Sequence, residues 1–201
     1  MKLIHTADWH LGNSMHDIDR LEESKQFLDW LKGQSAIGLP QWEDFPALEL
    51  YMDQVIFLLN QYIGAAEYGE GEKGVTPAMV NNYVKLKIIP PPNKKRYGKA
   101  HLAYLVMVCL LKQSMNTGDI KKLLPLTLDG EIVRARYAAF LDAWNKGRAL
   151  FVEQALKTAP EHEKEDSLLS MVFRSAAAAS LAMDWNQRMI SALLPADGKK
   201  E

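Results

Sequence analysis

The chain contains one cysteine, Cys109, among its 201 residues, which excludes an internal disulfide framework and is typical of a reducing compartment. It also lacks any apolar run near the roughly 20 residues that a transmembrane helix requires. Asp8 and His10 interrupt the first residues, so these do not form the apolar core of a secretory signal. Apolar residues nevertheless make up 48% of the chain, enough for a folded core. We therefore expect a soluble, cytoplasmic protein.

Acidic residues are absent from residues 74–118, although the whole chain has 25 of them and a net charge of −1. Residues 1–73, by contrast, contain 13 acidic and 5 basic residues. The acid-free segment carries seven basic residues: Lys85, Lys87, Lys94, Lys95, Arg96, Lys99 and Lys112. A local positive segment in an otherwise acidic chain is expected where a polyanion binds. A solvated basic face without a partner would have the same composition, so charge alone leaves both interpretations open.

Apolar periodicity predicts a helical chain. The helices are expected at residues 18–32, 48–66, 76–86, 100–113, 117–124, 130–156 and 165–194, after a short strand at 2–6 and with a linker at 33–46. Thr76 is a suitable N-cap and Pro77 suits the first helical position, whereas Pro90 begins a run of three prolines that a helix cannot enter. Residues 100–113 are apolar almost all round, which predicts a buried central helix. Cys109 and His101 are expected to pack or cap within it.

Residues 88–97 have the pattern of a two-stranded hairpin with a basic tip. We therefore expect an all-α fold with a small β-hairpin wing. The expected elements follow the order of a winged helix-turn-helix domain: helix, turn, helix, basic hairpin and buried helix. In such a domain the second helix can enter the major groove of DNA. Asparagine side chains can read base edges, and lysine or arginine side chains neutralise phosphates. The expected DNA-binding residues are Thr76, Asn81, Asn82, Lys85, Lys87, Lys94, Lys95, Arg96 and Tyr97.

Residues 75–124 resemble the DNA-binding domain of MerR-type transcription regulators. The resemblance rests on residues 80–83, the run from Leu86 through the three prolines, the Arg96-Tyr97 pair and the capped helix that follows. In that family an arginine, a tyrosine and a glycine usually stand where this chain has Asn81, Asn82 and Lys87. Residues 39–124 also resemble a bacterial family of unknown function that is built on the same module. The resemblance implies a MerR-like winged helix.

Residues 1–34 resemble the start of the SbcD nuclease subunit, a calcineurin-like metallophosphoesterase. Asp8 and His10 match the first metal-binding motif of that family, Asp-x-His. Its remaining motifs, Gly-Asp-x-x-Asp, Gly-Asn-His and Gly-His-x-His, are missing from the sequence. Two orphan ligands cannot hold a two-metal centre, so we expect an incomplete fragment, no bound metal and no phosphoesterase activity.

Residues 126–201 are expected to form a helical dimerisation or effector region after a winged-helix domain at 35–125. Five aromatic residues in it could line an effector pocket, or could fill a core or dimer seam: Tyr137, Trp144, Phe151, Phe173 and Trp185. The sequence contains no glycine-rich phosphate loop and no nucleophile elbow, so we expect neither an enzyme nor a cofactor.

These patterns predict a DNA-binding transcription regulator that inserts residues 76–86 into the major groove and holds the backbone with residues 93–97. A homodimer would engage two half-sites on double-stranded DNA. The alternative is a protein–protein interaction module whose basic segment docks on an acidic partner, because a fold does not determine a function.

Overall fold

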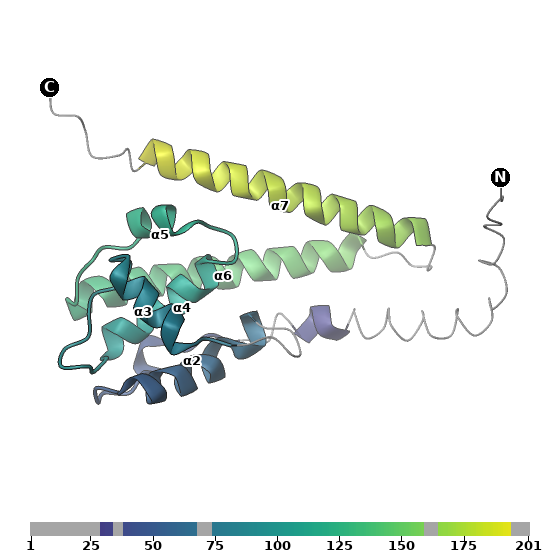
Figure 1. Cartoon of the computed structure of the whole chain (residues 1–201). Coiled ribbons are helices and arrows are strands. Elements are labelled where there is room, and N and C mark those ends of the chain that lie inside the picture. The colour runs from purple at the N-terminus through teal and green to yellow at the C-terminus, as the bar shows by residue number, and fades with distance from the viewer. Residues whose placement is uncertain (1–28, 34–37, 68–73, 159–164, 194–201) are drawn as a thin grey trace, which may run out of the picture.

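The computed structural model describes residues 29–33, 38–67, 74–158 and 165–193 (Figure 1). Its elements are η1 (Trp42–Asp44), α2 (Met52–Glu67), α3 (Pro77–Lys85), α4 (Lys99–Leu111), α5 (Thr117–Leu123), α6 (Gly130–Thr158) and α7 (Glu165–Leu193). Residues 29–33 are also helical. The expected strand at 2–6, most of the helix at 18–32 and the motif residues Asp8 and His10 lie outside the described residues.

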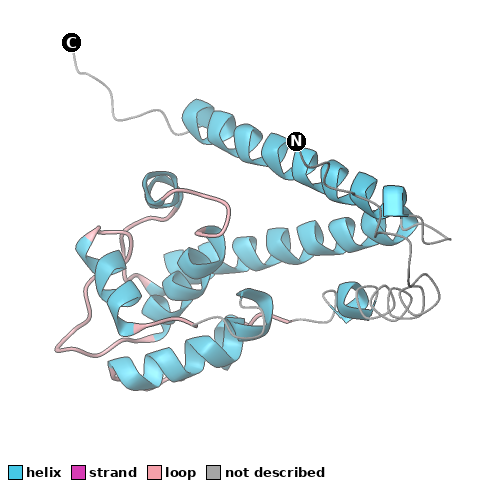
Figure 2. Cartoon of the chain, turned by 45° about the vertical axis from the view of Figure 1, so that its right-hand side comes forward, coloured by secondary structure: helices cyan, strands magenta, loops and turns pink. Residues whose placement is uncertain are grey.

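The described part of the chain is built of helices joined by loops, which confirms the all-α class (Figure 2). It contains no strand, only two isolated bridges, between Leu50 and Tyr97 and between Asn93 and Arg96. A tight turn therefore stands where the sequence predicted a two-stranded hairpin. The physical reason is the proline run that begins at Pro90, because proline has no N–H group to donate to a ladder.

Helix α4 forms the centre of the core, as its uniformly apolar sequence predicts. Every residue from His101 to Leu110 is buried, and Cys109 is one of these buried side chains. Helix α2 packs on one side of α4 and α6 packs on another. Helix α2 contributes Val55, Leu59 and Ile63, which are spaced four residues apart on one face and are fully buried.

Residues 38–46, which the sequence predicted as a linker, belong to this core. Leu39 and Phe45 are buried, and the Phe45 ring packs against the rings of Tyr62 and Tyr137. The Tyr137 hydroxyl on α6 donates a 2.7 Å hydrogen bond to the carbonyl oxygen of Pro40. The glycine and proline content of the segment therefore marks an irregular path and not a lack of packing.

The long helices extend beyond this core. Buried residues of α6 continue the core cluster as far as Leu141, whereas most of α7 is exposed and touches the rest of the chain mainly through α5. Within the described residues, none of the helices combines the length and apolarity that spanning a membrane requires.

Candidate nucleic-acid interface

Helix α3 begins as the sequence predicts. The Thr76 side chain accepts a 3.4 Å hydrogen bond from the backbone N–H of Met79, and Pro77 occupies the first helical turn. Thr76 is therefore a capping residue and half-buried, so its hydroxyl serves the helix end and not the outer surface.

A side chain that sequence reasoning missed fixes the entry to α3. Asn60 on α2 accepts a 2.7 Å hydrogen bond from the N–H of Val75 and donates a 3.3 Å bond to the carbonyl oxygen of the same residue. A Cβ atom on Gly74 would lie 2.2 Å from the side-chain amide oxygen of Asn60, so a larger residue there would displace this amide from its bonds to Val75. The pair of bonds ties the start of α3 to α2, which sets how the two helices meet.

Helix α3 presents two different faces. Val80 and Tyr83 are buried against the core, while Asn81, Asn82 and Lys85 are exposed. Lys85 follows Asn82 by three positions and Asn81 by four, so it lies on the same side of the helix as both asparagines. The exposed side of α3 therefore carries amide groups and a positive charge.

The end of α3 is a Schellman motif with an unusual residue. The N–H of Ile88 donates to the carbonyl oxygen of Tyr83 at 3.0 Å, and the N–H of Lys87 donates to that of Val84 at 2.9 Å. Lys87 has a φ of 55°, in the left-handed region that favours glycine. The motif therefore fixes the direction in which the exposed Lys87 side chain projects from the helix end. Its left-handed backbone conformation costs conformational free energy, because Lys87 has a Cβ atom.

The basic tip is a two-residue turn. Asn93 and Arg96 exchange two backbone hydrogen bonds of 3.1 and 2.8 Å, and the residues between them, Lys94 and Lys95, have φ values of 46° and 64°. Positive φ at both central residues is characteristic of a type I′ turn, which favours asparagine and glycine. The turn therefore holds two lysine side chains at an exposed point of the chain.

Tyr51, which sequence reasoning also missed, orients Arg96. The Arg96 guanidinium lies 5.2 Å from the Tyr51 ring centroid and donates a 3.1 Å hydrogen bond to the Tyr51 hydroxyl. The two residues are 45 positions apart, so neither periodicity nor spacing could have paired them. This contact limits the conformations of Arg96 while both side chains stay exposed.

Contacts with the core hold the same turn in place. The Tyr97 side chain, which the sequence predicted to bind DNA, is buried in the core, and burial raises the pKa of its hydroxyl. Its backbone exchanges two 2.9 Å hydrogen bonds with Leu50. The His101 Nδ1 atom accepts a 3.1 Å bond from the Gly98 N–H, and Nε2 lies 3.2 Å from the Pro91 carbonyl oxygen. His101 therefore caps α4 and ties it to the loop before the turn.

Hydrogen bonding and burial together define the protonation state of His101. Because Nδ1 accepts a hydrogen bond, the neutral ring carries its proton on Nε2 and donates it to the Pro91 carbonyl oxygen. Burial lowers the pKa of the imidazole below its usual value, although the Pro91 bond and the charge of Glu49 act in the opposite direction. The neutral form is the one that fits between the two backbone groups.

Five predicted basic residues lie along the chain from the end of α3 to the turn, and all are exposed: Lys85, Lys87, Lys94, Lys95 and Arg96. In the described part of the chain, no salt bridge to a carboxylate engages any of them. The other two cations of the acid-free segment are placed differently. Lys99 donates to the Trp42 carbonyl oxygen at 3.4 Å, and Lys112 lies at the opposite end of α4.

Figure 1 places α3 and the loop that follows it at the end of the molecule opposite the C-terminal end of α6, and Figure 2 shows the same arrangement. The five aromatic residues considered for an effector pocket do not form one site. Tyr137 is in the core, Trp144 is half-buried on α6, and Phe151, Phe173 and Trp185 are exposed. Among the described residues, no group of three or more histidine, cysteine, aspartate or glutamate side chains could hold a metal.

Residues 40–140 match the family described as "Domain of unknown function (DUF1836)". No curated protein and no solved structure matches the chain.

Proposed function

Because this chain belongs to the DUF1836 family, whose function is unknown, we propose a function for it from its own surface: binding of double-stranded DNA by a transcription regulator. In this proposal α2 and α3 form a helix-turn-helix of the MerR-like type, and the turn at residues 93–96 takes the place of the wing. Helix α3 enters the major groove, and the turn contacts the adjacent phosphates.

The observation that carries the proposal is the set of exposed cations at Lys85, Lys87 and residues 94–96, which have no carboxylate partner within the described residues and follow the amide-bearing face of α3. Asn81 and Asn82 each provide a donor and an acceptor that can match a base edge. The lysines that follow are free of carboxylate partners within the described residues, so binding phosphate would not require an ion pair to break. Arg96, held against Tyr51, would lose little side-chain entropy on contact.

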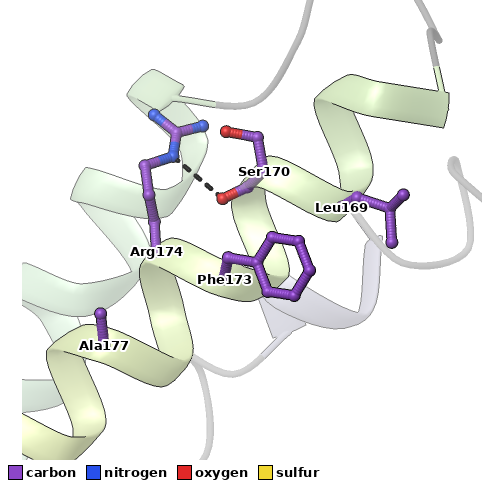
Figure 3. Close-up of a pocket in the computed structure, with 5 residues that line it drawn as sticks. All are labelled: Leu169, Ser170, Phe173, Arg174 and Ala177. Atoms are coloured by element: carbon purple, nitrogen blue, oxygen red, sulfur yellow. Dashed lines mark hydrogen bonds between the residues drawn. The ribbon is translucent and has the colours of Figure 1, made fainter.

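Helix α7 supports a dimeric form of this protein. Apolar, exposed residues recur at every fourth position of the helix and form a ridge that winds gradually around it: Leu169, Phe173, Ala177, Leu181, Trp185, Met189 and Leu193. Figure 3 shows the first three of these side chains beside Arg174, which folds back so that Nε donates to the Ser170 carbonyl oxygen at 3.3 Å. Large exposed apolar patches mark interaction surfaces, and a second copy would bring a second α3 to the DNA.

Selection of bound duplexes from a random pool, followed by a fluorescence anisotropy titration, tests the proposal. We expect a palindromic site, as two-fold symmetry requires. Replacing Lys94, Lys95 and Arg96 together with alanine is expected to weaken binding and to reduce the slope of log K against log salt by about 2.7, at ~0.9 for each lost phosphate contact.

The matched control removes the same charge far from the turn. Lys146, Lys157 and Arg188 on α6 and α7 are exposed and paired with carboxylates of their own helices. Alanine at all three should leave affinity and salt slope close to those of the wild type. Equal slopes for both triple variants would refute a phosphate-binding role of the turn.

One observation favours the second candidate function, docking on an acidic protein. Leu86 is 42% exposed between Lys85 and Lys87, and an apolar side chain among cations fits a protein surface better than a phosphate backbone. Replacing Leu86 with serine should weaken such a protein complex strongly and DNA binding only slightly. Specific retention of a partner protein together with failure of the duplex selection would favour this function.

A further inference from the structure

Helix α7 is apolar over much of its surface, although one copy of the chain covers little of it. Its apolar ridge of every fourth residue, from Leu169 to Leu193, contains six large side chains that are 38–71% exposed. At roughly 100 Å² each, these side chains expose ~600 Å² of apolar surface. A standard interface takes about 800 Å² from each partner, so the ridge is close to the size that a stable complex needs.

The contact of α7 with its own chain lies on the other side of the helix from the middle of this ridge. Among the described side chains of α7, only Ile190 is buried, and the helix touches the rest of the chain mainly through α5. Ile190 is nine positions from Leu181, and nine residues make two and a half turns of a helix. Leu181 therefore points away from the body of the chain, where a partner can reach it without displacing α5.

The first half of the ridge contains a shallow hollow. Its volume is about 460 Å³, and it is lined by Leu169, Ser170, Phe173, Arg174 and Ala177 (Figure 3). The Arg174 Nε atom donates to the Ser170 carbonyl oxygen, and among the described residues no carboxylate pairs with its guanidinium. An aromatic ring and a cation at one hollow are complementary to an aromatic side chain that stands beside a carboxylate.

The second half of α7 carries these two groups next to each other. Trp185 is 64% exposed and belongs to the same ridge, and Asp184 precedes it. The Asp184 Oδ2 atom accepts a 2.8 Å hydrogen bond from the Arg188 Nε atom of the same helix, which leaves Oδ1 for a second donor. A second copy of α7 therefore has the groups that the hollow of the first copy would take.

One antiparallel register joins both pairs of groups. Two antiparallel copies of α7 that cross at the helix midpoint, the height of Ala179, place Phe173 of each copy opposite Trp185 of the other. The same register places Arg174 opposite Asp184, because both pairs are equally spaced about the midpoint. A parallel arrangement would instead bring each of these charges next to its own copy, which repels it.

The residues near the midpoint suit such a crossing. Interdigitated ridges of every fourth residue are the commonest way in which helices pack in globular proteins. Residues 176–179 are all alanine, so the side chains around the helix are small at this height and the two axes can approach closely. Ala177 of one copy and Leu181 of the other then meet nearest the crossing.

We propose that α7 pairs antiparallel with α7 of a second copy of this chain, with Trp185 seated in the hollow beside Phe173 and the Asp184 carboxylate paired with Arg174. The two-fold axis passes α7 at the height of Ala179, and each contact occurs twice. This inference rests on the dimer that the proposed function includes, and it adds the orientation and the register. It makes no use of DNA, so its failure and the failure of DNA binding are separate results.

Disulfide trapping without DNA tests the register. Arg174→Cys and Asp184→Cys are made separately in the full chain, and the two proteins are mixed and oxidised. The two positions face each other in the proposed register, so the mixture should give a cross-linked dimer. Each variant alone should give none, because its own two copies lie ten residues apart along the axis, about 15 Å at ~1.5 Å per residue, and a disulfide needs Cα atoms within ~7 Å.

The control mixture combines Arg174→Cys with Lys146→Cys. Lys146 on α6 is exposed and paired with a residue four positions away, as Asp184 is, and it should give no cross-link. Ready cross-linking of either α7 variant with itself would show parallel or shifted pairing and would overturn the proposal. A mixture of the two α7 variants that gives no more cross-linked dimer than the control would overturn it as well.

Light scattering measures the contribution of the apolar contact. The wild-type chain should have the mass of two copies, and a monomer at concentrations up to about 100 μM would overturn the proposal. Trp185→Ala should raise the dissociation constant of the dimer at least ten-fold, because a seated tryptophan is a typical hot spot. The control Phe57→Ala removes an aromatic side chain of nearly equal exposure, 63% against 64%, from α2 and should leave the constant unchanged. Equal constants for the two variants would exclude the seat for Trp185.

Discussion

The backbone strain at Lys87 gives a prediction in which one substitution should stabilise the protein. Lys87 has a φ of 55° at the position after α3 where a Schellman motif favours glycine. A residue with a Cβ pays roughly 1–2 kcal/mol in this region. Glycine avoids that cost but loses about 0.5–1 kcal/mol more conformational entropy on folding. Lys87→Gly should therefore raise the free energy of unfolding by about 1 kcal/mol.

Two controls separate this backbone effect from the loss of charge. Lys87→Ala removes the same charge but keeps a Cβ, so it should be close to neutral. Lys85→Gly removes an exposed lysine from helical backbone two residues earlier and should destabilise the protein by up to about 1 kcal/mol.

The assay is thermal or urea unfolding followed by circular dichroism. For a chain of this size the expected rise for Lys87→Gly is about 2–4 °C in Tm. A Lys87→Gly variant no more stable than Lys87→Ala would refute the strain argument, because both differ from the wild type by the same charge.

Three further predictions concern the contacts that hold the candidate interface. Gly74→Ala should lower the free energy of unfolding in urea by about 1–3 kcal/mol, because the added Cβ would overlap the Asn60 side chain. In an Asn60→Gly background the same substitution should cost less. If the effects of the two substitutions on the free energy of unfolding simply added, the overlap would be contradicted. In the folded protein, burial lowers the pKa of the His101 imidazole below its ordinary value of 6.5. The folded state therefore has its full stability above pH 6.5, and this stability decreases as the pH falls below 6.5. His101→Gln, which can still cap α4, should flatten this dependence below about pH 7, and an unchanged pH profile would exclude the imidazole as its source. Tyr51→Leu should weaken DNA binding about two- to five-fold by releasing Arg96, with Tyr51→Phe nearer to wild type; equal effects of both would argue against the ring contact.

The sequence predicted most helices because their signals are local. Thr76 and Pro77 mark the start of α3, Asn116 caps α5, and the apolar run of α4 predicts burial on all sides. In each case the information lies within a few residues of the element itself. The pattern at residues 88–97 fits both a two-stranded hairpin and a single tight turn. The structure has the turn, because the three prolines in one arm cannot donate hydrogen bonds to a partner strand.

The candidate interface was only partly visible in the sequence. The exposed positions of Asn81, Asn82 and Lys85 follow from helical periodicity, because Val80 and Tyr83 must face the core. The burial of Tyr97, by contrast, depends on its bridge to Leu50, and the orientation of Arg96 depends on Tyr51. Such contacts join residues about 45 positions apart and leave no periodic signal.

By itself, the sequence determined where the chain is helical, which helix is central and where positive charge gathers, since propensity, capping and composition act over short distances. Tertiary structure alone decided that residues 38–46 join the core, that Asn60 fixes the entry to α3, and that α7 touches the rest of the chain mainly through α5. Those features require segments far apart in the chain to meet, and only packing of the whole core selects which segments do so.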